Sequence, residues 1–334
     1  MTSRAPLPVT ILTGFLGAGK TTLLRALLSD PGGQRLGVLV NDFGAINIDA
    51  ALIVEDSADA VSLSNGCVCC TIQTELVTAM RDLIESRPDL DRIVIEASGI
   101  SRALPLADTM MSEELQGLAV LDGMFCLVDA AAFPELDFAA TELAIDQITG
   151  ADMIVLTKTD LVDGAALAHL RDRLSGLMPH LRIVPAVQGN VPAEVLFGPA
   201  RADRPVGGTG HAHHHHGPDC GCGCDHDHDH DHHADAFASW SWRSASPLDE
   251  ARLRPALRRL GAGLLRAKGV LRVRGADGQV GAYEFQQVGR RSRLTRTGAA
   301  TAAGDSLLVA IGLSGQVDAA ALQAIMDAAT SRAA

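Results

Sequence analysis

A glycine-rich segment near the start of the chain has the composition of a phosphate-binding loop. It reads GFLGAGKTT, follows the β-rich run VTILT and precedes the apolar helical run LLRALL. Glycines at these positions let backbone N–H groups turn towards phosphate oxygens, and the N-terminus of the following helix adds a partial positive charge. The segment therefore predicts a nucleoside triphosphate site that involves Gly14, Gly17, Ala18, Gly19, Lys20, Thr21 and Thr22.

Four residues of this predicted site would perform distinct tasks. Lys20 would reach the β- and γ-phosphates as a catalytic cation, and Thr21 would place its hydroxyl on Mg²⁺. Glu96, which ends the apolar run IVI, would hold Mg²⁺ through water or position the attacking water, and Gly99 could bond the γ-phosphate through its backbone. The alternatives are a glycine-rich turn that binds nothing and an ordinary carboxylate at a strand end.

The segment TKTD, residues 157–160, follows the apolar run MIVL and predicts a loop that recognises guanine. The Asp160 carboxylate would accept two hydrogen bonds from guanine, and adenine offers no such pair of donors. Lys158 would cover the base with its aliphatic stem. Thr157 stands where guanine-binding proteins usually carry Asn, so a role for Asp160 as a helix cap stays open.

Two further segments have the composition of metal sites. The first is NGCVCC, in which the thiolates of Cys67, Cys69 and Cys70 could converge on one soft or borderline cation, unless they are inert packing residues. The second is a linker rich in His, Asp and Cys that predicts weak, exchangeable sites for Zn²⁺, Co²⁺ or Ni²⁺, unless it is a solvated spacer. Its ligands would be His211, His213, His214, His215, His216, Cys220, Cys222, Cys224, His226, His228, His230, His232 and His233.

The order of apolar runs predicts the fold that positions these residues. Between Val9 and about Pro185, β-rich runs alternate with helical patterns, which indicates an α/β domain with a mainly parallel sheet and helices on both faces. The predicted strands of this domain are Val9–Thr13, Gly37–Val40, Arg92–Glu96, Met124–Val128, Met153–Leu156 and Arg182–Val184, and those after the linker are Leu264–Val273, Val280–Val288 and Ser306–Ile311. We expect this P-loop domain over residues 6–190, a disordered metal-binding linker over 191–237, and a smaller α+β domain with an antiparallel sheet over 238–330.

Composition narrows the possible partners and location. The 40 acidic and 28 basic residues give a net charge of −12, which argues against nucleic acid and anionic membrane surfaces as partners. No apolar run is long enough to span a membrane, and the first ten residues lack the apolar middle of a secretion signal. Six of the seven cysteines form two tight groups, so reduced thiols and a cytoplasmic location are expected.

Together these segments resemble the family of CobW-like GTPases, which act as metallochaperones or metal insertases. The landmarks span nearly the whole chain: GFLGAGKTT, NDFGAINID, NGCVCC, EASG, TKTD, LRAKGVLRV and YEFQQVG. The resemblance implies that the loop around Asn41, Asp42 and Phe43 is a switch that responds to the nucleotide. It also implies that the three cysteines of NGCVCC hold the delivered metal. Asp42, Ala97-Ser98 and Thr157 depart from the usual family pattern.

The resemblance and the residues together predict a GTPase that uses GTP and Mg²⁺, binds Zn²⁺ in preference to Co²⁺ or Ni²⁺, and passes it to a client metalloprotein. Bound metal and bound nucleotide must then change each other's affinity by the same factor. Cobalt supply for cobalamin synthesis, activation of a metalloenzyme such as nitrile hydratase, and a passive metal buffer or sensor remain alternatives. An ATP-using kinase or transport ATPase is a further one, and a homodimer stays open.

Overall fold

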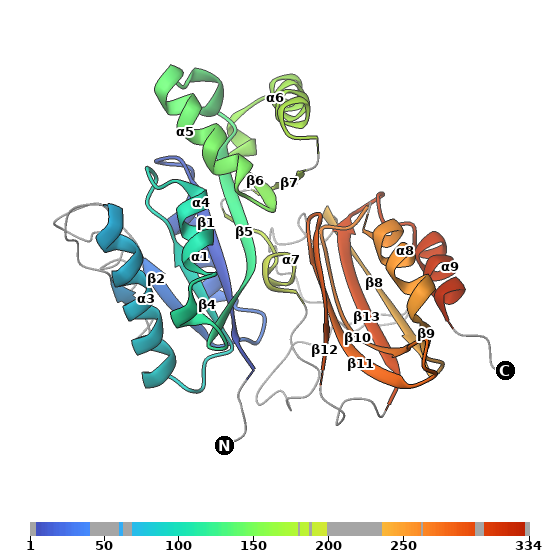
Figure 1. Ribbon diagram of the computed structural model, residues 1–334. Coiled ribbons are helices and arrows are strands. Elements are labelled where there is room, and N and C mark those ends of the chain that lie inside the picture. Colours follow the sequence, from blue (N-terminus) through green and yellow to red (C-terminus); the bar gives the residue numbers. More distant parts are fainter. Residues whose placement is uncertain are drawn as a thin grey trace, which may run out of the picture.

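The computed structural model describes residues 5–40, 60–62, 69–179, 181–186, 189–198, 236–261, 263–297 and 304–330. These residues form two separate sheets, each with its own helices (Figure 1). The larger sheet lies between Leu7 and Pro185 and is parallel, and the smaller sheet follows it and is mainly antiparallel. The predicted fold class, an α/β domain with a mainly parallel sheet plus a smaller α+β domain, is confirmed.

The larger sheet has the strand order β3-β2-β4-β1-β5-β6-β7. Its strands are β1 (Leu7–Gly14), β2 (Leu36–Val40), β3 (Ala60–Ser62), β4 (Arg92–Glu96), β5 (Ala119–Asp129), β6 (Met153–Thr157) and β7 (Arg182–Pro185). Each predicted apolar run of this domain lies in one of them, and only the short β3 was not predicted. Because neighbouring strands are parallel, their carboxyl ends meet at one edge, where the candidate site residues lie.

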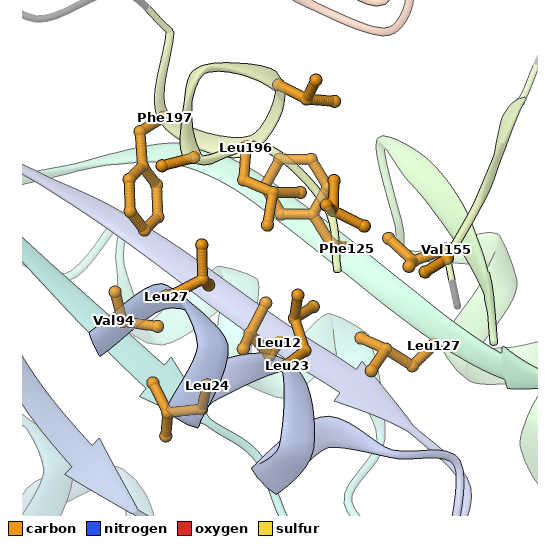
Figure 2. Close-up of a cluster of buried hydrophobic side chains, with 14 of the residues drawn as sticks. Leu12, Leu23, Leu24, Leu27, Val94, Phe125, Leu127, Val155, Leu196 and Phe197 are labelled. Atoms are coloured by element: carbon orange, nitrogen blue, oxygen red, sulfur yellow. The ribbon is translucent and has the colours of Figure 1, made fainter. Parts of the chain in front are cut away.

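Helices cover both faces of this sheet. Helices α1 (Lys20–Ser29) and α7 (Ala193–Phe197) pack on one face. Helices α3 (Cys69–Ser86), α4 (Ala103–Thr109), α5 (Phe138–Thr149) and α6 (Gly164–Leu177) pack on the other. The apolar residues of α1 recur at helical spacing, so Leu23, Leu24 and Leu27 all point towards the strands, where Leu196 and Phe197 of α7 join them (Figure 2).

Several helices begin at an aspartate, which explains where they start. The carboxylates of these residues accept a hydrogen bond from the backbone N–H three residues later, and this satisfies a donor that the first turn leaves unpaired. The caps are Asp137 for α5, Asp163 for α6, Asp249 for α8 (Glu250–Leu260) and Asp318 for α9 (Ala319–Ala329). Within the described ranges, no helix is both long and apolar enough to span a membrane.

The smaller sheet has the order β12-β11-β10-β13-β8, with β9 beside β10. Its strands are β8 (Phe237–Ser244), β9 (Leu248–Asp249), β10 (Arg266–Arg274), β11 (Val280–Val288), β12 (Arg291–Arg296) and β13 (Ser306–Leu313). Helices α8 and α9 lie together on one face (Figure 1). There they enclose a core that includes Trp240, Trp242 and Phe285.

A buried ionic cluster joins the two domains. The Asp122 carboxylate in β5 accepts hydrogen bonds from Arg92 of β4 at 2.5 Å and from Arg266 of β10, and all three side chains are almost fully buried. Burial alone would raise the pKa of Asp122, but the positive charges of Arg266 and Arg92 outweigh burial and hold it well below its usual value. Arg266 also donates to the Leu196 carbonyl oxygen of α7 at 2.5 Å.

The predicted linker over residues 191–237 is wrong at its first residues. Residues 193–197 form α7, and its Val195, Leu196 and Phe197 are fully buried in the core of the first domain. This short apolar run stands among Pro and Gly, and its burial against the core favours a helix that its flanking residues do not predict. At the other end, β8 begins at Phe237 and pairs with β13. Residues 199–235, which hold the predicted weak metal sites, lie outside the described residues.

Candidate functional site

The phosphate loop connects β1 to α1 through three glycines with positive φ. Gly14, Gly17 and Gly19 have φ angles of 136°, 75° and 91°, which favour glycine over any other residue. A side chain at Gly14 would also collide with the Leu127 carbonyl oxygen of β5. Gly19 precedes α1 and provides no side-chain cap, so the first N–H groups of that helix can bind an anion.

The Lys20 side chain folds back over this loop. Its Nζ donates hydrogen bonds to the carbonyl oxygens of Gly14 at 2.8 Å and Phe15 at 3.2 Å, and the side chain is buried. The ammonium therefore lies inside the loop, where the terminal phosphates of a nucleotide would bring negative charge. Phosphate oxygens would give it charge-assisted hydrogen bonds, which are stronger than those to a carbonyl oxygen.

Thr21 and Glu96 meet at the end of the two central strands. Because β1 and β4 are parallel neighbours, Leu12 is in register with Glu96, which puts the Glu96 carboxylate beside the loop. The Thr21 hydroxyl donates to Glu96 Oε1 at 2.7 Å, and Glu96 is only 4% exposed. Hydroxyl and carboxylate oxygens are the donors that Mg²⁺ prefers, so this pair suits the predicted magnesium site.

Gly99 lies against the phosphate loop. A Cβ atom at Gly99 would stand 2.6 Å from Leu16 Cδ2 and 2.8 Å from the Leu16 backbone nitrogen, so only glycine leaves room for this approach. Gln147 of α5 holds the segment from behind, because its Nε2 donates to the carbonyl oxygens of Gly99 at 3.1 Å and Ser101 at 2.9 Å. Gln147 is fully buried and was not predicted; the only signal is an amide on an otherwise apolar helix face.

The predicted guanine loop follows β6 and is tied to the phosphate loop. The Thr157 hydroxyl donates to the Ala18 carbonyl oxygen at 2.8 Å, with the Val128 carbonyl oxygen 3.2 Å away as a second acceptor. Thr157 is 3% exposed, so this hydrogen bond is inside the protein. The hydroxyl at the position of the usual Asn therefore connects the two predicted nucleotide-binding segments directly. Asp160 follows in the short helix η3 (Thr159–Leu161) and is exposed.

Asp129, at the end of β5, forms an ion pair with Lys158 of this loop. Lys158 has a φ of 53° and is the one non-glycine residue with a positive φ in the described part of the chain. Its Nζ lies 2.7 Å from Asp129 Oδ2, and Asp129 Oδ1 accepts the backbone N–H groups of Ala131 and Ala132. Asp129 was not predicted, and in the sequence it resembles any other acid that follows a strand.

A second segment that was not predicted passes beside the first turn of α1. After β7, Ala186 donates its N–H to the Leu156 carbonyl oxygen at 2.8 Å, which extends the sheet by one residue. Gly189 then has a φ of 75°, and a Cβ atom there would stand 3.0 Å from the Leu23 nitrogen. This segment therefore borders Thr22, one of the predicted nucleotide-binding residues.

The predicted cysteine site lies mostly outside the described residues. Cys69 and Cys70 are the first two residues of α3, but their side chains are not described. Cys67 and the predicted switch residues Asn41, Asp42 and Phe43 fall in the gaps between the described ranges. Among the described side chains, no group of three or more His, Cys, Asp or Glu residues is close enough to hold a metal ion. The metal site therefore stays a prediction.

The glycine loop between a central parallel strand and its helix, with Lys20 folded into it, defines the P-loop nucleotide-binding fold. Residues 8–185 match the CobW/HypB/UreG nucleotide-binding domain, and residues 237–330 match the cobalamin synthesis protein cobW C-terminal domain. The chain belongs to the CobW/HypB/UreG family.

Three curated relatives show what similar chains are called. The zinc chaperone CobW of Pseudomonas aeruginosa is 38% identical over 229 residues, which cover 59% of this chain and 61% of that protein. The zinc chaperone YjiA of Escherichia coli is 38% identical over 197 residues, covering 58% and 61%. The zinc-regulated GTPase metalloprotein activator 1 of Schizosaccharomyces pombe is 35% identical over 193 residues, covering 56% and 47%. Each match thus spans less than two thirds of the relative.

Proposed function

We propose that this chain is a GTP-hydrolysing metallochaperone that binds zinc and transfers it to a client metalloprotein in the cytoplasm. The observation that carries the proposal is the contact between Thr21 and Glu96 at 2.7 Å, beside a loop into which Lys20 is already folded. This arrangement suits a nucleoside triphosphate with its magnesium ion. The names of the relatives support GTP as the nucleotide and zinc as the cargo.

Four residues in and beside the loop have tasks in hydrolysis that follow from their contacts. Lys20 would exchange its bonds to the Gly14 and Phe15 carbonyl oxygens for bonds to the β- and γ-phosphates. Thr21 and Glu96 would hold Mg²⁺, which supplies positive charge to the phosphates as negative charge moves onto them. The backbone N–H of Gly99, close against Leu16, would bind the γ-phosphate.

Guanine would be read by Asp160 with the help of the Lys158 stem. The ion pair with Asp129 holds the Lys158 ammonium in place, which leaves its methylene groups to cover one face of the base. Asp160→Asn should move the preference from GTP to xanthosine triphosphate, because the substitution exchanges an acceptor for a donor. Equal competition by GTP and ATP in the parent protein would contradict the guanine assignment.

Zinc would be held by Cys67, Cys69 and Cys70, which directly precede or begin α3. The switch segment 41–43 follows β2, whose end is in register with Glu96 of β4. A nucleotide that changes this segment would therefore act close to the strand end that binds Mg²⁺. The segment from His211 to His233 would add weak sites that raise the local metal concentration, so its deletion should slow loading only when zinc is scarce.

The decisive experiment follows GTP hydrolysis across a zinc titration. We expect zinc to stimulate hydrolysis in the parent, and the triple change of Cys67, Cys69 and Cys70 to Ser to abolish that stimulation, because a hydroxyl is a poor zinc ligand. Cys126→Ala is the matched control. Burial raises the pKa of the Cys126 thiol to about 12, so it is not a thiolate and should bind no metal.

Two outcomes of that titration would contradict the proposal. If zinc binds tightly but leaves hydrolysis unchanged, the chain is a passive buffer or sensor. If the triple serine variant keeps the full stimulation, the zinc that matters is bound elsewhere. Unchanged hydrolysis in the Cys126→Ala variant shows that any loss comes from the cysteine motif and not from a general loss of thiols.

A further inference from the structure

The smaller sheet has one face covered by helices and one face without them. Trp242, Leu271, Phe285 and Leu308 point towards α8 and α9, where they form the core of the C-terminal domain. Residues between these positions must point to the opposite face, because side chains alternate along a strand. In Figure 1 this second face is turned towards the larger domain.

The pairing register shows which residues of this second face lie side by side. One row crosses the sheet through Arg291, Val288, Arg266, Ile311 and Ser239. The next row runs through Arg293, Gln286, Lys268, Val309 and Ser241, and a third through Thr295, Glu284, Val270, Leu307 and Arg243. The three rows follow one another along the same face.

The first row is already an interface. Val288 and Ile311 pack into the core of the larger domain, and Arg266 reaches Asp122 of β5. A crevice of about 80 Å³ lies where this row and the next meet β5, between Leu121, Gln286 and Arg293. The second and third rows continue the face away from this contact. Their paired apolar residues Val270 and Leu307 are 37% and 45% exposed.

Basic side chains outnumber acidic ones around this apolar pair, although Glu284 is in register with Val270 on the same face. Lys268, Arg272 and Arg293 stand on the same face, and no described residue forms a hydrogen bond or an ion pair with the Lys268 ammonium. Burial nevertheless lowers the pKa of Lys268. From residue 236 onwards the chain has 14 basic and 7 acidic residues, whereas residues 1–235 have 14 and 33. The C-terminal part is therefore positive within an acidic protein.

We propose that Lys268, Val270, Arg272, Arg293, Leu307 and Val309, here called the open sheet face, bind an acidic segment of another protein that also carries apolar side chains. Charge complementarity supports an acidic partner, and the exposed pair of Val270 and Leu307 supports apolar contacts. Because the open sheet face adjoins the interface with the larger domain, a conformational change in that domain would alter the affinity for the partner. If the proposed function is correct, this partner is the zinc client. The docking surface itself does not depend on that role.

A polypeptide suits this surface better than a nucleic acid does. Proteins that bind single strands on a sheet use exposed aromatic side chains on which the bases stack. The second and third rows contain no aromatic residue. Their centre is aliphatic, and the guanidinium and ammonium groups around it outnumber the carboxylate of Glu284, which suits carboxylates next to leucine or valine side chains.

The test measures binding of a short fluorescein-labelled peptide of Glu and Leu to the full chain by anisotropy. The double variant Lys268→Glu, Arg272→Glu should weaken binding roughly tenfold, since two attractions become repulsions. Leu307→Thr should weaken it several-fold. The control is Arg252→Glu, Arg254→Glu, which makes the same charge change on the exposed side of α8 and should leave binding unchanged. Trp240 and Trp242 fluorescence reports whether each variant is folded.

Several other results of this experiment would overturn the proposal. Equal loss in both double variants would mean that only net charge matters. If the Lys268→Glu, Arg272→Glu variant fails to fold, the double variant Lys268→Gln, Arg272→Gln replaces it. Unchanged peptide binding in that variant would overturn the proposal. Tighter binding of oligouridine than of the peptide would replace the protein partner by nucleic acid. Much tighter peptide binding after Asp→Asn changes at 219, 225, 227, 229, 231 and 235 would mean that the chain's own acids occupy the face. GTP hydrolysis, measured in parallel, tests the proposed function separately.

Discussion

The phosphate loop and the domain interface both bury charged side chains, but they satisfy those charges differently. At the interface, the carboxylate of Asp122 lies between the guanidinium groups of Arg92 and Arg266, so full opposite charges meet inside the protein. In the loop, the Lys20 ammonium donates to two backbone carbonyl oxygens, which carry only partial charge. At the interface both guanidinium groups bind Asp122 Oδ2, and Asp122 Oδ1 accepts no hydrogen bond within the described part of the chain. In the loop, phosphate oxygens would offer Lys20 stronger, charge-assisted hydrogen bonds.

This difference predicts that the two regions determine different properties of the protein. Removing one member of a buried ion pair leaves the others without compensation, so the interface residues should determine stability. The loop residues would gain charge-assisted hydrogen bonds to phosphate when a nucleotide binds, so they should determine affinity. Exchanging residues in one region should therefore change one property and leave the other nearly unchanged.

The largest effect is expected for Asp122→Asn. The substitution leaves two buried guanidinium groups without their carboxylate, so the free energy of unfolding should fall by about 3–5 kcal/mol. Urea unfolding followed by the fluorescence of Trp240 and Trp242 measures it. Asp305→Asn is the control, because its partner Arg243 is 74% exposed and this ion pair should contribute less than about 1 kcal/mol. Equal effects of the two substitutions would contradict the comparison.

The same ion cluster predicts a pH dependence. The folded protein holds the pKa of Asp122 below its usual value, so its contribution is complete above about pH 4, the ordinary carboxyl pKa, and is lost as the pH falls through the lower folded pKa. The stability difference between the parent and Asp122→Asn should therefore stay constant from pH 7 to about pH 5 and shrink only in acid. A difference that grew on acidification would have the wrong sign.

Lys20→Ala should have the next largest effect, and this effect should be on nucleotide affinity rather than on stability. Loss of the ammonium should weaken GTP and GDP binding by about a hundredfold, because charge-assisted bonds to phosphate are lost. The unfolding midpoint should hardly change. Lys268→Ala removes a partly buried ammonium in the C-terminal domain and should leave nucleotide affinity unchanged. Undiminished nucleotide binding in the Lys20 variant would contradict the loop assignment.

A smaller effect is expected for Thr157→Val, which keeps the shape but removes the hydrogen bond to Ala18. Guanine nucleotide affinity should fall roughly fivefold, in line with about 1 kcal/mol for one buried hydrogen bond. Thr13→Val is a matched control, because the buried Thr13 hydroxyl has no hydrogen-bond partner in the described part of the chain. Calorimetric titration of GDP compares them, and equal losses would show that Thr157 has no special connection to the loop.

Local patterns predicted much of the fold and of the phosphate loop. Runs such as Arg92–Glu96 and Val280–Val288 are strands at the predicted residues, because apolar β-rich sequence and turn residues agree there. The strands β8 and β12 were missed, since β8 alternates tryptophan with serine beside a low-complexity segment and β12 is a polar edge strand with three arginines. Such strands are defined by their neighbours rather than by their own composition.

Neither the ionic cluster nor the residues that hold the site segments in place could be predicted from the sequence. Asp122 is 30 residues from Arg92 and 144 residues from Arg266, so nothing local indicates that they meet. Likewise, Gln147 contacts Gly99 across 48 residues. The Thr21 and Glu96 pair was easier to anticipate, because the carboxyl ends of neighbouring parallel strands meet at one edge of the sheet.

The central claim is that nucleotide and zinc affect each other through the loop and the cysteine motif. The direct test is a zinc titration of the full chain with GTP, with GDP and without nucleotide, together with GTP and GDP titrations with and without zinc. We predict that zinc affinity differs between the GTP and GDP states, and that zinc changes the ratio of GTP to GDP affinity by the same factor. Equal zinc affinity in all three states would contradict the account.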